Sequence, residues 1–313
     1  MNNPKRKKIL IVGTGAVGGY YGGMLAKKGY DVTFIARGAN YKALKEKRLT
    51  LTRDGVKEII PINVVEICHG KSLQETFDYV FICVKSAQTE KAIKSVINNI
   101  NENTSVISFQ NGVENEEIIS NIIGVKKTIG AIVFVAAQLT EPGVIFQSGY
   151  NGAVIGELTG KITDRISEIQ KMLLESGIDC KITENIQGEL WNKLVWNASF
   201  NPLSVITGKT VDKLLAEDYN LVKDTMTEVK DVAIALGLNI RPDTVEFNLN
   251  RSKGFIGFKT SMLQDFERGK SIEIEELVGI VIRKAKEKNI SVPNIQRIYN
   301  EIKQKITTSH VTY

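Results

Sequence analysis

A glycine-rich turn near the start of the chain constrains its fold more than any other feature. Residues 8–12 form a short run rich in large aliphatic side chains, and residues 13–18 follow with the pattern G-x-G-x-x-G. Residues 16–28 then favour a helix that ends at Gly29, and residues 31–36 favour a second strand. A strand, a helix and a strand within roughly thirty residues predict a βαβ unit with a right-handed crossover.

The turn has the chemistry of a dinucleotide-binding site. Its first glycine permits the tight turn, its second lets the backbone approach a pyrophosphate, and its third lets helix and strand pack closely. The helix start adds backbone N–H groups and the positive end of the helix dipole. The residues that we expect to hold the cofactor here are Gly13, Thr14, Gly15, Ala16, Val17 and Gly18.

The end of the second strand indicates which dinucleotide is bound. Enzymes that use NAD place a carboxylate there for the ribose 2′-hydroxyl, but no acidic residue lies between Val32 and Leu44. Arg37 follows the strand, and a guanidinium forms charge-assisted bonds with a 2′-phosphate. The sequence therefore predicts NADPH/NADP+ as cofactor, with Arg37 reading the phosphate; the alternative is a surface arginine on a loop.

Polar residues follow two further predicted strands, residues 79–84 and 104–109. Lys85 comes after the first, and Asn111 lies two residues after the second. Ligands of open parallel sheets gather at the carboxyl ends of the strands, so these side chains are candidates for the nicotinamide side. Ordinary turn chemistry is the alternative, because Asn followed by Gly favours a turn.

The chain divides into an α/β half and a helical half. We expect a Rossmann-like dinucleotide-binding domain over residues 1–184, an all-α domain over residues 185–313, and the active site in the cleft between them. Asp54 and Gly55 predict a hairpin turn. Further strands are expected at 128–136, 143–147, 153–157 and 179–182, and helices at 89–97, 114–122 and 162–176. Helices of the second half are expected at 187–200, 212–236, 243–251, 261–269, 273–288 and 294–307.

One predicted helix of the second half carries a polar stripe. Lys193, Asn197 and Asn201 recur every four residues, which places them on one face among large apolar side chains. Buried Lys and Asn side chains are costly unless they are paired, so the stripe is a candidate site; a solvent-facing stripe is the alternative. Pro202 is expected to kink or end this helix.

A second polar stretch begins at Ser261, which has capping-box spacing to Gln264. Glu273 follows twelve residues after Ser261, but Glu275 and Glu276 lie close by. An acidic first helical turn would also explain these glutamates, and the residues alone do not choose among them.

Composition limits the partners. The net charge is +6, yet the one dense basic run, residues 5–8, lacks aromatic companions, so a solvated tail is favoured over a nucleic-acid arm. Residues 9–26 carry no charge but include six glycines, which argues against a membrane span or signal peptide. The scattered Cys68, Cys83, Cys180, His69 and His310 predict reduced thiols, no metal site and a cytoplasmic protein. The sequence leaves a homodimer open.

These motifs resemble the ketopantoate reductase family (2-dehydropantoate 2-reductase) over nearly the whole chain. The residues that carry the resemblance are Gly13-Thr-Gly-Ala-Val-Gly18, Val84-Lys85, Gln110-Asn111-Gly112, Trp191-Asn-Lys193, Asn197, Asn201-Pro202, Ser261-Met-Leu-Gln-Asp265 and Glu273-Ile274.

The resemblance implies reduction of 2-dehydropantoate to (R)-pantoate by NADPH, a step of pantothenate and coenzyme A biosynthesis. It implies that Lys193 donates the proton and that Glu273 lies where substrate meets the nicotinamide ribose. It assigns substrate binding to Asn197, Asn201, Ser261 and Asn111, and cofactor contacts to Arg37, Lys85, Asn111, Ala136 and Glu273.

The chain departs from the family at two positions. Family members often have Asn where this chain has Val211 and Phe258. A reductase of another small 2-keto acid is therefore a second hypothesis, alongside a sugar-phosphate dehydrogenase. A non-catalytic NADPH sensor and a nucleic-acid-binding protein are hypotheses from other classes.

Overall fold

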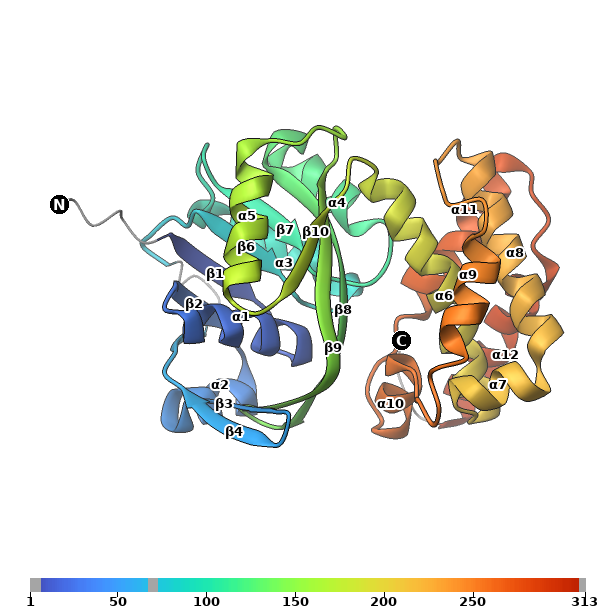
Figure 1. Cartoon of the computed structure of the whole chain (residues 1–313), viewed down its shortest axis with the longest axis horizontal. Helices are drawn as coiled ribbons and strands as arrows, with labels where there is room; N and C mark the ends of the chain where they lie inside the picture. The colour runs from blue at the N-terminus through green and yellow to red at the C-terminus, as the bar shows by residue number, and fades with distance from the viewer. Residues whose placement is uncertain (1–6, 67–72, 310–313) are drawn as a thin grey trace. The chain divides into compact units, whose positions relative to one another are not determined.

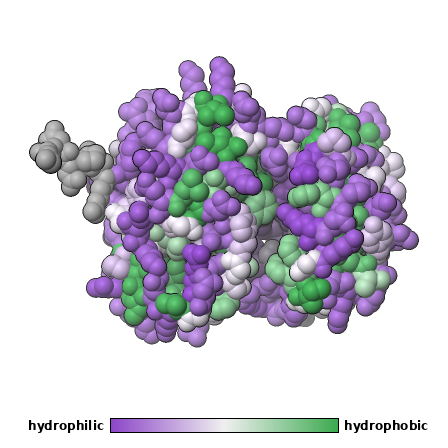
Figure 2. Space-filling view, in the orientation of Figure 1, coloured by the Kyte–Doolittle hydropathy of each residue, from purple (hydrophilic) through white to green (hydrophobic). Residues whose placement is uncertain are grey.

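The computed structural model describes residues 7–66 and 73–309. The chain forms two compact units, residues 1–186 and residues 187–313 (Figure 1). The expectations for Lys5, Arg6, Cys68, His69 and His310 lie outside the described residues. On the face that Figure 2 shows, hydrophilic side chains cover most of each unit, and hydrophobic side chains form separate patches.

The first unit is built on a sheet in the order β4-β3-β9-β8-β7-β6-β1-β2-β5, with β10 beside β9. From β5 to β7 every neighbouring pair is parallel, as the βαβ pattern predicts. The strands are β1 (Lys8–Val12), β2 (Asp31–Ile35), β3 (Leu49–Arg53), β4 (Val56–Ile60), β5 (Asn63–Val65), β6 (Tyr79–Ile82), β7 (Ser105–Ser108), β8 (Thr128–Glu141), β9 (Val144–Glu157) and β10 (Asp179–Ile182).

Helices cover both faces of this sheet, so β1 is buried on each side. Ile9 and Ile11 pack into the core beneath α1 and α5, and Leu10 and Val12 pack into the core beneath α3 and α4. The continuous aliphatic run of residues 9–12 follows from this arrangement, because a strand covered on both faces has no polar side. The helices are α1 (Ala16–Lys28), α2 (Gly38–Lys47), α3 (Thr89–Ser95), α4 (Asn115–Ile123) and α5 (Asp164–Glu175).

The second unit is helical throughout its described part. A π-helical turn, Glu275–Gly279, begins two residues after Glu273, and such turns are frequent at functional sites. The helices are α6 (Ile186–Thr207), α7 (Val211–Glu217), α8 (Tyr219–Ala235), α9 (Thr244–Ser252), α10 (Ser261–Glu267), α11 (Ile280–Lys288) and α12 (Pro293–Ser309).

Several expectations for individual elements are confirmed. Helix α1 and strand β10 have the predicted bounds, and Asp54 and Gly55 both have positive φ, +50° and +78°, as a type I′ turn requires. Others are wrong. The strands expected at 143–147 and 153–157 are one strand, β9, which pairs with β8 along its length.

Pro202 does not end α6, which was one of the two expected outcomes. The helix continues for five residues beyond it, to Thr207. A proline inside a helix costs about 3 kcal/mol. The next turn buries Leu203 and Val205, and full burial of such side chains contributes about 1.5–3 kcal/mol each. Packing therefore outweighs the lost hydrogen bond.

The basic run at the start is only partly a tail. Lys8 begins β1, and its ammonium lies 2.5 Å from the Glu75 carboxylate. Lys7 lies 3.8 Å from Asp78 and 3.6 Å from Glu168. Among the described residues, no helix is long and apolar enough to cross a bilayer, and no group of three metal-ligating side chains occurs.

Candidate active site

The glycine-rich turn joins β1 to α1 in a conformation that only glycine tolerates at two of its positions. Gly13 has φ +101°, and a Cβ on Gly18 would lie 2.1 Å from the Gly13 carbonyl oxygen. Gly15 differs, because a Cβ there would meet no atom within 4 Å. The first and third glycines are therefore required by the fold, whereas the space beside Gly15 is open to a ligand.

A pair of hydrogen bonds ties this turn to the end of β2. The Thr14 hydroxyl donates to the Ile35 carbonyl at 2.9 Å, and the Asn40 amide donates to the Thr14 carbonyl at 2.6 Å. Asn40 also accepts from the Gly143 backbone N–H at 2.7 Å. Sequence reasoning missed Asn40, because α2 shows little apolar periodicity and buries only Leu44.

Arg37 lies two residues after the end of β2 and directly precedes the first turn of α2. Its side chain is exposed, and its guanidinium donates to the Gln88 side-chain oxygen at 2.9 Å. The guanidinium is thus held by a neutral partner that a phosphate could replace. This position at a strand end is where a 2′-phosphate reader is expected.

Buried side chains cross-link the loops after β6 and β7. Gln110 donates to the Val84 carbonyl at 2.9 Å and to the Thr89 hydroxyl at 2.7 Å, and Asn115 donates to the Asn111 carbonyl at 2.7 Å. Ser86 donates to the same Asn111 carbonyl. These buried hydrogen bonds therefore fix the two loops that carry Lys85 and Asn111.

The predicted cofactor contacts on these loops differ in exposure. Lys85 is exposed and Asn111 is half-buried. Ala136 is exposed on β8, next to a break in the β8–β9 register between Val135 and Ala136. A bulge of this kind redirects a strand, and bulges recur beside binding sites.

The predicted polar stripe lies on α6 among buried residues. Asn197 and Asn201 are buried, and Lys193 is half-buried between the buried Asn192 and Leu194. The pKa of Lys193 is lowered to about 8, mainly by burial; the positive charge of Arg251 adds to this shift, and the negative charge of Glu273 opposes it. The Asn201 side-chain oxygen has no hydrogen-bond partner among the described residues. The face that sequence spacing singled out is thus polar and largely enclosed.

Helix α10 begins at Ser261, as predicted, but its capping residue differs from the prediction by one position. Thr260, rather than Ser261, caps the helix, because its hydroxyl accepts from the Leu263 N–H at 3.2 Å. The Gln264 amide donates to the Lys259 carbonyl at 2.9 Å, so the capping box is not formed. Ser261 is exposed, and its hydroxyl is not used as the cap.

The three glutamates that the sequence left open have different surroundings. Glu273 is buried, and its negative charge raises the pKa of Lys193. Glu275 accepts from the Tyr299 hydroxyl at 2.5 Å and lies 3.2 Å from the Lys303 ammonium. Burial raises the pKa of Glu276. Among the three, Glu273 is the one whose charge shifts the pKa of Lys193.

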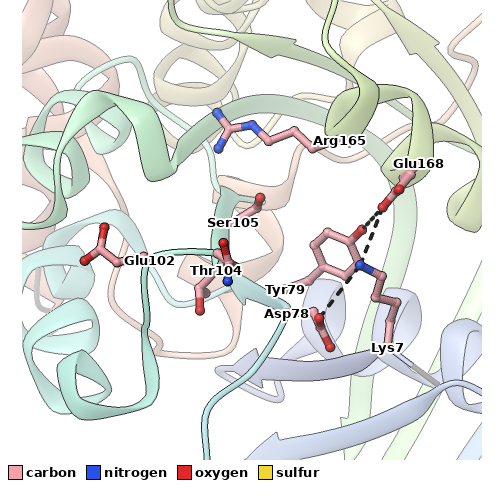
Figure 3. A pocket seen from close by; sticks show the side chains of 9 residues that line it. Lys7, Asp78, Tyr79, Glu102, Thr104, Ser105, Arg165 and Glu168 are labelled. Atoms are coloured by element: carbon pink, nitrogen blue, oxygen red, sulfur yellow. Dashed lines mark hydrogen bonds and ion pairs between the residues drawn. The ribbon is translucent and has the colours of Figure 1, made fainter. Parts of the chain in front are cut away.

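A separate polar pocket opens at the amino ends of the central strands β6 and β7, opposite the carboxyl ends described above (Figure 3). Its charged groups are paired, some with one another and some with residues outside the pocket: Arg165 pairs with Glu157 and Glu102 with Lys127. The Tyr79 hydroxyl donates to Glu168 at 2.9 Å, and Lys7 lies close to both Asp78 and Glu168. We assign no ligand to this pocket, since the strands present their amino ends here and ligands of parallel sheets gather at the carboxyl ends.

Comparisons with known proteins cover almost the whole chain. The family model described as ketopantoate reductase PanE/ApbA matches residues 9–160, and its C-terminal counterpart matches residues 185–306. A 2-dehydropantoate 2-reductase of Nostoc sp. is 30% identical over 304 residues, which cover 95% of this chain and 94% of that protein.

Solved structures agree in fold. A 2-dehydropantoate 2-reductase from Geobacter metallireducens has a TM-score of 0.87 at 29% identity, over 95% of this chain and 99% of that one. A D-mandelate dehydrogenase with NADH and anilino(oxo)acetate has a TM-score of 0.90 at 22% identity, over 97% of this chain and 100% of that one, and it shows the fold alone. On these matches, the chain belongs to the ketopantoate reductase family of oxidoreductases.

Proposed function

We propose that this protein reduces 2-dehydropantoate to (R)-pantoate with NADPH. The groups that would hold the cofactor belong to the first unit. The proton donor and the groups that would bind the substrate belong to the second. The observation that carries it is Lys193, an ammonium on the buried face of α6 with a pKa of about 8 and the charge of Glu273 acting on it. A group with such a pKa is protonated in most molecules at neutral pH and gives up its proton readily.

The glycine-rich turn would hold the pyrophosphate. Open space beside Gly15 fits a close approach of the phosphates, and the start of α1 offers backbone N–H groups. Arg37 would bind the 2′-phosphate in exchange for its bond to Gln88. When bound, the nicotinamide supplies the hydride for the ketone carbon.

The second unit would hold the substrate and move the proton. As the ketone oxygen gains negative charge, the Lys193 ammonium stabilises it and donates a proton to it. Glu273 favours the protonated form of Lys193 and so keeps the donor loaded. The buried Asn201 oxygen, which lacks a partner among the described residues, suits a substrate hydroxyl as donor. Asn197 and the exposed Ser261 add neutral polar groups.

The direct test is an NADPH oxidation assay with purified protein and 2-dehydropantoate, run in parallel with NADH. We expect turnover with NADPH, and we expect Arg37→Ala to raise the KM for NADPH more than the KM for NADH. An equal loss with both cofactors would remove the argument for the 2′-phosphate. No turnover with 2-dehydropantoate would refute the proposed substrate.

Reduction of another 2-keto acid is the second candidate, and one observation favours it. Phe258 stands where the resemblance leads one to expect an amide, and its ring lies 5.4 Å from that of Phe255. Phe255 in turn packs edge-on against Trp196 at 6.3 Å. An apolar row of this kind suits an apolar substituent, so the assay includes 2-keto acids with aliphatic and aromatic side chains.

A further inference from the structure

Helix α9 and the loop after it run alongside α6 in the second unit. Asn248 donates to the Asn192 carbonyl at 3.4 Å, and the Trp196 indole donates to the Ser252 hydroxyl at 2.8 Å. These contacts join the turn of α9 that ends at Ser252 to the turn of α6 that starts at Asn192. Arg251 lies on the first of these turns and Lys193 on the second, so the two cations belong to neighbouring stretches.

Charge is unevenly distributed at this place. Arg251 lies near enough to Lys193 to lower its pKa, whereas Glu273 raises it. Burial also lowers the pKa of Arg251 itself, which means that its charge is poorly solvated. With both cations charged, Lys193, Arg251 and Glu273 by themselves sum to one positive charge. A singly charged anion would balance them.

The guanidinium of Arg251 also lies near an aromatic side chain of its own helix. Phe247 lies one turn earlier on α9, and the Arg251 guanidinium carbon stands 5.9 Å from the centre of its ring. A guanidinium presents a planar fork of N–H donors, and that fork matches the two oxygens of a carboxylate. Lysine could supply the charge here but not this geometry.

We propose that Arg251 binds the carboxylate of a 2-oxo acid substrate, beside the ketone that Lys193 protonates. The assignment rests on the proposed function for the class of substrate, and it adds a residue that determines specificity for the acid over neutral ketones. A bound carboxylate would oppose the effect of Arg251 on its neighbour and so raise the pKa of Lys193. Substrate binding would then load the proton donor.

Binding of oxamate, an unreactive analogue of a 2-oxo acid, tests the assignment without turnover. Oxamide is the neutral counterpart, and isothermal titration with and without NADP+ measures both affinities. A charge-assisted bond predicts that the wild type prefers oxamate by about ten- to a hundredfold. Arg251→Met should reduce the preference to about twofold or less, and Arg251→Lys should leave an intermediate preference.

Arg241→Met is the matched control. Arg241 stacks on the same Phe247 ring at 3.9 Å but is paired with Asp243 at the surface, so its loss should leave the preference unchanged. A second readout is the pH profile of turnover. Without the positive charge of Arg251, the pKa of Lys193 rises, so the fall of kcat/KM at high pH should move to higher pH.

The outcomes separate this inference from the proposed function. A wild type that shows no preference for oxamate, or a folded Arg251→Met variant that retains the preference, overturns the role of Arg251. If the preference depends on Arg251 but 2-dehydropantoate is not reduced, the anion site stands and the proposed substrate falls. If 2-dehydropantoate is reduced and the preference survives in Arg251→Met, the proposed substrate stands and the role of Arg251 falls.

Discussion

The hydroxyl groups of Ser204 and Thr260 lie 2.6 Å apart in the buried interior of the second unit, although 56 residues separate them along the chain. Ser204 also donates to the Asn201 carbonyl at 2.7 Å, and Thr260 caps α10. This pair therefore connects the turn of α6 that carries Asn201 to the first residue of α10, Ser261. Two candidate substrate-binding side chains thus start from one hydrogen-bonded cluster.

Replacing Lys193 by Met should lower kcat by about a hundred- to ten-thousandfold, because the reaction loses its general acid. NADPH should still bind with unchanged affinity, since the glycine-rich turn belongs to the other unit. Turnover and fluorescence titration of NADPH measure the two effects. Lys213→Met, at an exposed lysine of α7, is the control that should retain activity. Near-normal turnover of Lys193→Met would contradict the proton-donor role.

Activity should depend on pH through the same side chain. The pKa of Lys193 is about 8, and a proton donor works only while protonated, so kcat/KM should be highest below this pH and fall above it. Glu273→Gln removes a charge that raises this pKa, and the fall should then begin at lower pH. A wild-type profile that stays flat up to about pH 10 would show that another group limits the reaction.

Two glycines of the turn should respond differently to alanine. In Gly18→Ala the new methyl group would collide with the Gly13 carbonyl, and overpacking of this kind costs about 1–3 kcal/mol of unfolding free energy. In Gly15→Ala the methyl group enters open space, so the stability should barely change while the affinity for NADPH falls by about tenfold or more. Urea unfolding and cofactor titration measure the two quantities. Unchanged affinity in Gly15→Ala would argue against a pyrophosphate at this point.

Glu116 should make the stability of the protein depend on pH. It is buried at the start of α4, neither of its carboxylate oxygens has a hydrogen-bond partner among the described residues, and burial raises its pKa from 4.5 to about 7. The folded protein therefore binds the proton more tightly than the unfolded chain does. The stabilisation that this provides is complete below about pH 4.5 and is lost as the pH rises through about 7.

The corresponding variant is Glu116→Gln, which keeps the size of the side chain without its charge. From the raised pKa we expect a gain of about 1–3 kcal/mol over the wild type near pH 8 and almost no difference near pH 5. Urea unfolding at the two pH values measures it. Glu117→Gln, at the exposed neighbour, should show no such difference. An equal effect at both pH values would mean that the carboxylate does not titrate in this range.

Much of the fold follows from patterns with one physical origin. The aliphatic run of β1, the glycines after it and the βαβ spacing reflect close packing of backbone on backbone, which leaves few other residues possible. Helix α2 was missed because it buries only Leu44 and so has no apolar stripe. The prediction that Pro202 could end α6 was wrong because the packing that extends the helix to Thr207 involves distant segments, which local sequence does not reveal.

The candidate site was predictable to a similar extent. Spacing alone placed Lys193, Asn197 and Asn201 on one face, but it gave no means of choosing Glu273 over Glu275. Arg251 was missed, because an arginine in an amphipathic helix has the same local pattern whether its charge faces solvent or lies near another cation. Its neighbours on α6 lie more than fifty residues away in the chain, and only tertiary structure brings them together.

The hydrogen bonds that cross-link the loops after β6 and β7 affect the binding of any ligand to these loops. Gln110, Thr89 and Asn115 have already immobilised these loops, so little backbone freedom is left to surrender on association. The affinity of these loops for a ligand is then governed by the contacts that the ligand makes rather than by the entropy cost of ordering the loops. Loosening the scaffold, for instance with Gln110→Ala, should weaken association mainly through entropy, even though that side chain points inward.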